Sequence, residues 1–282
     1  MPKKSFCVTF AAALLFTAFA CFGQGSDAAQ RNEEIRRRNE QITANNAIVA
    51  RTFAAGNAAF QAGNLDEAIA QYNEGLAADA DQVALLANKS QALNRRGIER
   101  YNTAVKATDP ALKSSGKAAA ASDWKESFAA ASHAVEVVKA TPGMPAPNVI
   151  SSYLMRAEAG KLLLRTDASV ADAVFRAWQE YGAVEPDEGK KLKAQIDAAQ
   201  ALLDGGLADR AVTEFRKLVT ANEYNLDAVL GLGMALFTTG EEPNFKEAAT
   251  YIQRFVKQAP DSHPQKPKAR QLLRELGPYV GQ

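Results

Sequence analysis

Few side chains in this sequence could do acid–base, nucleophilic or metal chemistry. Its only histidines are His133 and His263, and neither has a second histidine or a carboxylate cluster beside it that would complete a metal shell. A nucleophile–histidine–acid arrangement would need the same two residues, and neither lies near a Gly-x-Ser-x-Gly pattern. We interpret both as ordinary surface or boundary histidines and expect no metal site.

The glycines do not form a nucleotide-binding pattern. Gly231-Leu232-Gly233 follows no predicted strand, so it is not a dinucleotide fingerprint, and the sequence has no Gly-Lys-Ser/Thr phosphate loop. We therefore expect no cofactor, and we predict that the protein is not an enzyme.

The first 23 residues look like a secretory signal peptide. Lys3 and Lys4 precede an uncharged stretch with an apolar centre over residues 6–22, and small residues follow near the expected cut. Both cysteines, Cys7 and Cys21, lie in this leader, so cleavage after Gly23 would leave a chain without cysteine. We expect an exported protein, periplasmic or secreted.

Two alternatives keep the protein at a membrane. The leader is just long enough to remain as an uncleaved anchor, because a spanning helix needs about 20 residues. Cys21 could instead be the lipidated first residue of a lipoprotein, although Ala18 stands where such signals usually carry leucine. We expect the protein to contact a membrane only through an uncleaved leader or a lipidated Cys21.

The charge balance excludes a general affinity for nucleic acid. The sequence has 33 basic and 32 acidic residues, a formal net charge of +1. Binding to phosphate backbones usually requires a concentrated basic face. The one dense basic run, Arg36-Arg37-Arg38, has glutamates on both sides and is typical of a solvated helix face.

Alanine-rich segments and the scarcity of alternating β-branched residues predict an all-α fold. One apolar frame with helical spacing occurs five times, each time around a small residue. The five frames are Leu65, Ile69, Tyr72, Leu76 around Ala68; Trp124, Phe128, Ala131, Val135 around Ser127; Val170, Val174, Ala177, Tyr181 around Ala173; Ala208, Val212, Phe215, Val219 around Ala211; and Phe245, Ala249, Ile252, Val256 around Ala248. A small side chain at the crossing lets two antiparallel helices approach closely, which predicts helical hairpins.

These hairpins resemble the tetratricopeptide repeat. The resemblance is strong in residues 55–69, AGNAAFQAGNLDEAI, and in residues 232–240, LGMALFTTG, followed by FKEAA and Pro260. It implies an all-α superhelical solenoid of helical hairpins that binds other proteins. It covers roughly residues 47–260 and is weaker in the second and third repeats.

The departures from this pattern divide the chain. We expect residues 24–46 to be a polar linker or frayed helix, and residues 47–140 to hold repeats 1 and 2. The second of these has a long inserted hairpin, whose first helix runs through Gly97. Three prolines in residues 141–148 predict a hinge. Residues 149–261 would hold repeats 3 to 5, and residues 262–282 a capping helix.

The resemblance also implies a concave groove lined by the first helix of each hairpin. The positions carried over to this sequence are Phe53, Asn57, Phe60, Asn88, Gln91, Arg95, Lys161, Lys193, Gln200 and Met234. Asn57 and Asn88 match two asparagines that grip a peptide carboxylate in chaperone-binding members, but Phe53 replaces the lysine of that clamp. Most aromatic residues fall at core positions, and the role of Trp178 is open.

We therefore expect an exported, non-catalytic scaffold or adaptor that binds a protein or peptide in its groove. The alternative is a membrane-anchored assembly factor of an envelope or secretion machine. A third hypothesis, an all-α glycan-processing enzyme, would need a buried glutamate in an aromatic-lined cleft, and no glutamate in the sequence stands out for that role.

Overall fold

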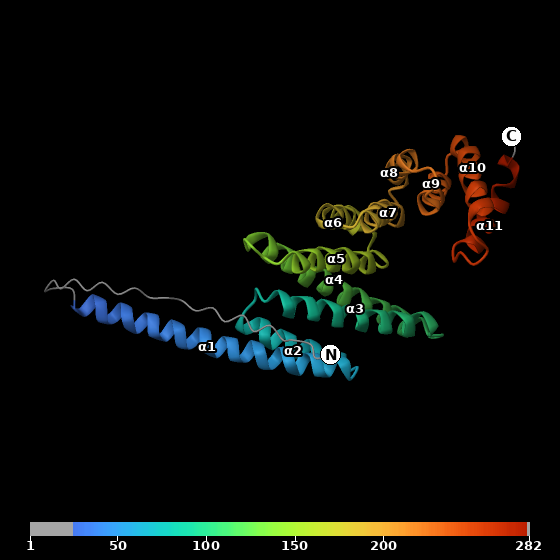
Figure 1. Cartoon of the computed structure of the whole chain (residues 1–282). Helices are drawn as coiled ribbons and strands as arrows, with labels where there is room; N and C mark the ends of the chain where they lie inside the picture. Colours follow the sequence, from blue (N-terminus) through green and yellow to red (C-terminus); the bar gives the residue numbers. More distant parts are fainter. Residues whose placement is uncertain (1–24, 281–282) are drawn as a thin grey trace, which may run out of the picture. The chain divides into compact units, whose positions relative to one another are not determined.

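The computed structural model describes residues 25–280, and this range consists of helices joined by short turns, without a strand (Figure 1). The predicted signal peptide, residues 1–23, lies outside the described residues. The helices are α1 Gly25–Gln61, α2 Leu65–Ala78, α3 Val83–Lys106, α4 Pro110–Ala140, α5 Ala146–Leu164, α6 Ala171–Val184, α7 Glu188–Asp204, α8 Ala208–Ala221, α9 Leu226–Thr238, α10 Glu242–Gln258 and α11 Lys266–Glu275, with 3-10 turns at Ala168–Val170 and Gly277–Tyr279.

The chain divides into two units, residues 1–45 and 46–282. The described part of the first unit is the amino-terminal part of α1, where we expected a linker or frayed helix. Arg36 pairs with Glu33 at 2.8 Å and with Glu40 at 3.2 Å along this helix. Such pairs stabilise an exposed helix by about 0.2–0.5 kcal/mol each.

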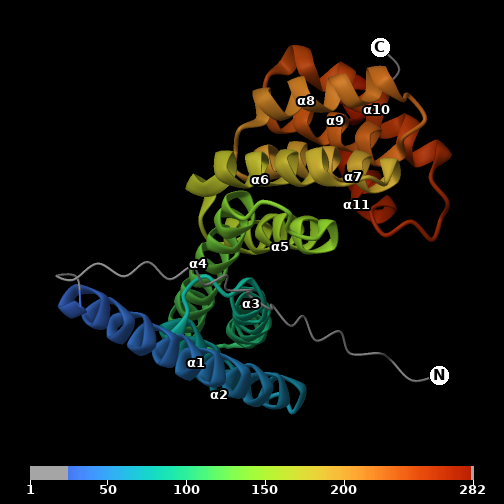
Figure 2. The ribbon, with the colours of Figure 1, turned by 60° about the vertical axis from the view of Figure 1, so that its left-hand side comes forward.

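In the second unit the helices pack in consecutive pairs (Figure 1 and Figure 2). The pairs are α3 with α4, α5 with α6, α7 with α8, and α9 with α10, while α2 packs with the end of α1 through Tyr72 and its neighbours. Helix α11 packs on α10, and its Ala269 joins the core that α7 to α10 build. A terminal helix of this kind covers the apolar face that the last hairpin would otherwise expose.

The small residues of the repeated frame lie where the helices cross. Ala68, Ser127, Ala211 and Ala248 are all fully buried. Ser127 replaces the methyl contact by hydrogen bonding, since its Oγ lies 2.8 Å from Ser90 Oγ on α3. The frame prediction is confirmed for α2, α4, α8 and α10.

In α6 the apolar residues of the frame are confirmed, since Val174, Ala177 and Tyr181 are all buried, but its small residue is not the one predicted. Ala173 is only half-buried, whereas Ala171, Val174 and Ala177 face the core. The buried small residue at the start of α6 is Ala171, which directly follows the 3-10 turn at Ala168–Val170.

Replacing the crossing alanines by leucine should wedge their hairpins open. We expect Ala68→Leu and Ala211→Leu each to lower the free energy of unfolding by about 1–3 kcal/mol, because added methylenes cannot fit a packed crossing. Ala173→Leu is the matched control and should change stability little. Urea unfolding followed by circular dichroism measures all three, and an equal effect at Ala173 would contradict the register described here.

Two glycines let aromatic rings lie against the first helix of a hairpin. A Cβ at Gly56 would overlap the ring of Tyr72, and one at Gly97 would overlap the ring of Trp124. Gly97 lies inside α3, so the prediction that this helix runs through it is confirmed. The long hairpin therefore exists, with 24 residues in α3 and 31 in α4.

The proline-rich stretch forms the turn between α4 and α5. Helix α4 ends at Ala140 and α5 begins at Ala146, and the two helices pack together. Val135 of α4 shares a core with Tyr153 and Ala157 of α5, so apolar packing continues from one predicted block to the next. Bending at this turn stays a prediction.

No helix within residues 25–280 is long and apolar enough to cross a bilayer.

Candidate interaction surfaces

The residues that we predicted to line a groove lie on the first helices of the hairpins. These helices also contact one another in order, α3 with α5, α5 with α7, and α7 with α9. Many of the predicted residues are hydrogen-bonded or stacked within the chain, and they form separate clusters.

Asn57 and Asn88 form one such cluster. Asn57 Oδ1 accepts hydrogen bonds from Asn88 Nδ2 at 2.7 Å and from the Tyr72 hydroxyl at 2.9 Å. The two asparagines therefore link the first hairpin to the second. This accounts for both residue types by packing and occupies Asn57 Oδ1 and Asn88 Nδ2 within the chain.

Four more of the predicted residues are near Asn57 and Asn88 in the sequence. They are Phe53 and Phe60 on α1, and Gln91 and Arg95 on α3. Phe53 and Phe60 are half-buried against the core of the first hairpin. The Arg95 guanidinium lies 5.7 Å from the centre of the Phe60 ring, and its Nε donates to Glu99 at 3.1 Å. Gln91 is exposed.

Lys161 and Lys193 meet at one carboxylate on α7. Asp197, only 9% exposed in its side chain, accepts from Lys161 Nζ at 3.2 Å and from Lys193 Nζ at 2.9 Å. The Lys161 ammonium also lies 5.7 Å from the Trp178 ring. Two cations on one carboxylate leave this part of the surface with excess positive charge.

The last two predicted residues stand apart from these clusters. Gln200 donates to Asp204 at 2.7 Å, one turn further along α7. Met234 on α9 is half-buried against the core formed by α7 to α11. The structure thus brings together Asn57 with Asn88, Phe60 with Arg95, and Lys161 with Lys193, but not the other predicted residues. The role of all ten in binding stays a prediction.

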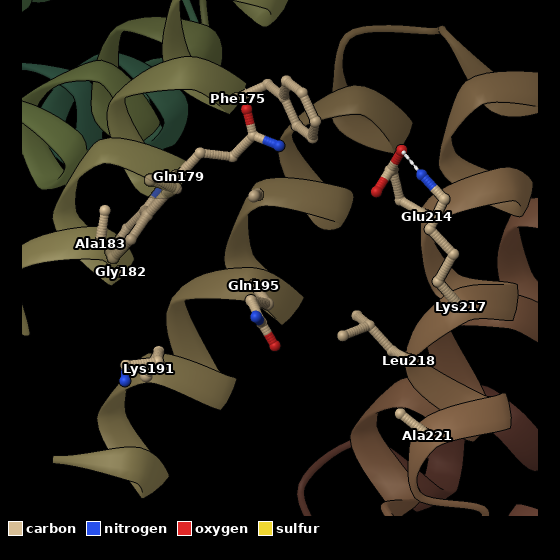
Figure 3. A pocket seen from close by; sticks show the side chains of 12 residues that line it. Phe175, Gln179, Gly182, Ala183, Lys191, Gln195, Glu214, Lys217, Leu218 and Ala221 are labelled. Carbon is tan, nitrogen blue, oxygen red and sulfur yellow. Dashed lines mark hydrogen bonds and ion pairs between the residues drawn. The ribbon is translucent and has the colours of Figure 1, made fainter.

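A different surface, lined by none of the predicted groove residues, is a hollow in the second unit. It lies between α6, α7 and α8 and has a volume of about 600 Å³ (Figure 3). Helix α7 packs against both α6 and α8. The lining residues are Phe175, Trp178, Gln179, Gly182, Ala183, Lys191, Gln195, Ala198, Glu214, Lys217, Leu218 and Ala221. We call this the α6–α8 hollow.

The α6–α8 hollow combines apolar surface with free polar groups. Phe175, Trp178 and Leu218 supply the apolar part. Gln179 and Gln195 are exposed, and neither side-chain amide hydrogen-bonds to another described residue; Figure 3 shows Gln179 extending into the open space. Lys217 is paired with Glu214 at 2.8 Å. The hollow can therefore seat an apolar side chain beside unoccupied amide donors and acceptors.

Sequence reasoning missed this hollow because it searched the first helices of the hairpins. Two of its walls, α6 and α8, are second helices, and only their packing around α7 makes the space. The available signal was Trp178, which lies beside the repeated frame and whose role was open.

The groups that could do chemistry form no reactive set in the part of the chain that the structure describes. No three metal-binding side chains gather within residues 25–280. His133 pairs with Asp81 at 2.8 Å, and His263 packs edge-on against Phe255 at 4.9 Å.

Glu185 is the one buried glutamate among the described residues. It accepts a 2.6 Å hydrogen bond from the Tyr181 hydroxyl, which, with the Asp187 backbone N–H, holds the pKa of Glu185 below its usual value. The general acid of a glycosidase needs a raised pKa instead. Glu185 therefore does not fit the third hypothesis.

Helical hairpins with buried small residues at their crossings, stacked in sequence and capped by a final helix, form an all-α solenoid of the kind that the resemblance to the tetratricopeptide repeat implies. No family model matches the sequence, and no curated protein matches it either.

Two solved structures are similar to this chain at low identity. One is the MamA protein, with 15% identity and a TM-score of 0.46, covering 77% of this chain and 98% of that one. The other is YrrB, described as a TPR protein with an unusual peptide-binding site, with 14% identity and a TM-score of 0.47, covering 77% and 88%. The fold assignment rests on this chain's own hairpins.

Proposed function

We propose that the protein is a non-catalytic scaffold that binds a segment of another protein, and that the α6–α8 hollow is its main contact site. The observation that carries this proposal is the hollow itself, with free amides beside an apolar wall. Its volume of about 600 Å³ falls within the range of roughly 300–1,000 Å³ that binding sites occupy.

The lining fits a peptide segment. A bound segment has backbone N–H and C=O groups that lose water and need partners, and Gln179 and Gln195 can supply both kinds. Phe175 and Leu218, both half-buried, can cover one apolar side chain of the segment, as apolar residues at the centre of protein interfaces do. The residues on the first helices, including Gln91 and Arg95, are the alternative contact surface.

Export is part of the proposal and is supported by the leader sequence, Lys3-Lys4 followed by the apolar stretch 6–22. The protein then acts in the periplasm or outside the cell. In the alternative, an uncleaved leader or lipidated Cys21 holds it at a membrane as an assembly factor. Fractionation with and without detergent separates the two, because shortened protein in the soluble exported fraction would contradict the anchored form.

Removing the two free amides should weaken partner binding. We expect Gln179→Ala/Gln195→Ala to raise the dissociation constant of a captured, purified partner by about tenfold, from two lost hydrogen bonds of roughly 0.5–1.5 kcal/mol each. Both residues are exposed, so the fold should be unchanged. Titration calorimetry measures the affinity.

The matched control is Gln91→Ala/Arg95→Ala on α3, which alters the predicted groove and should leave the affinity unchanged. The reverse pattern, loss in the α3 variant alone, would move the site to the first helices. If the wild-type chain retains no protein at all from the exported fraction, the scaffold proposal itself is wrong.

A further inference from the structure

The end of the α3–α4 hairpin carries an unusual combination of side chains. We define the hairpin tip as residues 102–118, which comprise the end of α3, the turn and the start of α4. Within the tip only Ala104, Ala107 and Gly116 are shielded from solvent, and all other residues are exposed. Most of the tip is therefore open to solvent.

The hairpin tip is held in shape by its own contacts. Gly116 lets α4 approach α3 closely, because a Cβ at this position would lie 2.7 Å from the Ala104 Cβ. Asp109 caps α4 by accepting a 2.8 Å hydrogen bond from the Ala111 N–H, and Pro110 begins the helix. The exposed side chains therefore stand on a preformed support.

Two large apolar side chains are exposed on this support. Val105 is 48% exposed near the end of α3, and Leu112 is 62% exposed in the first turns of α4. Single exposed apolar residues are common on protein surfaces. Two of them at the end of one narrow protrusion, where no neighbouring helix covers them, suggest a surface that enters an apolar environment.

Three lysines belong to the same tip. Lys106, Lys113 and Lys117 form no ion pair with any described residue, although the Lys117 ammonium lies 6.0 Å from the Tyr101 ring. Asp109 is the only carboxylate among residues 102–118, and it is engaged in the helix cap. Three lysines against one aspartate give the tip a formal charge of +2.

We propose that the hairpin tip docks on an anionic lipid surface. Val105 and Leu112 enter the boundary between headgroups and acyl chains, and the three lysines lie among the lipid phosphates. Lysine suits this place because its long stem stays with apolar groups while its ammonium reaches the polar layer. An apolar tip with a rim of lysines is typical of peripheral membrane contacts.

A lipid surface explains both features of the tip, whereas an acidic protein surface would explain the lysines alone. The contact is peripheral and does not depend on the leader. It is also separate from the α6–α8 hollow, so a partner segment and a membrane could be bound at the same time.

Co-sedimentation with vesicles tests the proposal. The probe is the chain from residue 24 onward, which contains every described residue, mixed with phosphatidylglycerol-containing or pure phosphatidylcholine vesicles at low salt. We expect binding to the anionic vesicles that decreases with added salt, and much weaker binding to phosphatidylcholine. Absence of binding to the anionic vesicles would overturn the proposal.

Two tip variants separate the contribution of the lysines to vesicle binding from that of the apolar residues. Lys106→Gln/Lys113→Gln/Lys117→Gln should weaken binding by about fivefold for each lysine removed. Val105→Asp/Leu112→Asp should weaken it by at least about tenfold, because both apolar insertions are lost. Neither should lower the melting temperature appreciably, since all five side chains are exposed.

Matched controls carry the same changes elsewhere. Lys246→Gln/Lys257→Gln/Lys268→Gln removes three other exposed lysines, and Tyr224→Asp replaces an apolar residue that is 75% exposed. Both controls should bind vesicles like the wild type. Equal losses in tip and control variants would contradict docking by the tip. Tip variants that bind vesicles normally but lose an acidic protein partner would show that the lysines serve a protein instead.

Discussion

Replacing Asp123 by alanine is expected to lower the free energy of unfolding by about 3–5 kcal/mol, the typical cost of removing one partner from a buried ion pair. Asp123 lies on α4 with only 3% of its side chain exposed. It accepts from Arg96 at 2.6 Å and from Arg100 at 2.9 Å, both on α3. The substitution leaves the Arg96 guanidinium, 19% exposed, without this carboxylate.

The effect should reach the first hairpin as well, because Arg96 also pairs with Asp66 on α2 at 2.5 Å. Glu99→Ala is the control: Glu99 is on the same helix and pairs with Arg95, but both side chains are about half exposed. Exposed pairs contribute about 0–1 kcal/mol, so this variant should unfold at nearly the wild-type urea concentration. Similar losses in both variants would contradict the role given to the buried network.

Replacing Phe215 by alanine should have an effect of similar size at the other end of the chain. Phe215 is fully buried on α8, and a Cβ at Gly231 of α9 would overlap its ring. Truncation leaves a cavity between two hairpins that can collapse only partly, at a cost of about 3–5 kcal/mol. Urea unfolding measures the loss, and amide exchange should rise first in α8 to α10.

Phe175→Ala is the matched control for that prediction. Phe175 has the same side chain but is only half-buried at the α6–α8 hollow, so its loss should cost clearly less. If the two variants are equally stable, the packing of α8 against α9 is not as described.

Much of the fold could be predicted from residue spacing. A helical period places Ala68, Ala211 and Ala248 on the buried face whatever the distant contacts are, and all three are fully buried. Gly97 was predicted to lie inside a long helix because no turn residue accompanies it, and α3 does run through it. Both predictions depend only on residues that are near one another in the sequence, and this is why residue spacing was enough to make them.

The parts that were missed depend on tertiary packing. In α6 the frame places Val174, Ala177 and Tyr181 in the core correctly, but the buried small residue is Ala171 and not Ala173. The hydrogen bond between Asn57 and Asn88 joins residues 31 positions apart, and the groove pattern alone does not reveal it. The α6–α8 hollow is formed by three helices together, so its shape does not follow from one sequence segment, and the open role of Trp178 was the only hint of it.

The most direct test of the proposed binding site is site-specific photo-cross-linking. A photoreactive phenylalanine derivative is placed at Gln179 in the hollow or at Gln91 on α3, both exposed, and the cross-linked partner peptide is mapped by mass spectrometry. The scaffold proposal predicts one reproducible partner segment cross-linked from position 179 and none from position 91. Cross-linking from position 91 alone, or from neither position while the partner stays bound, would contradict it.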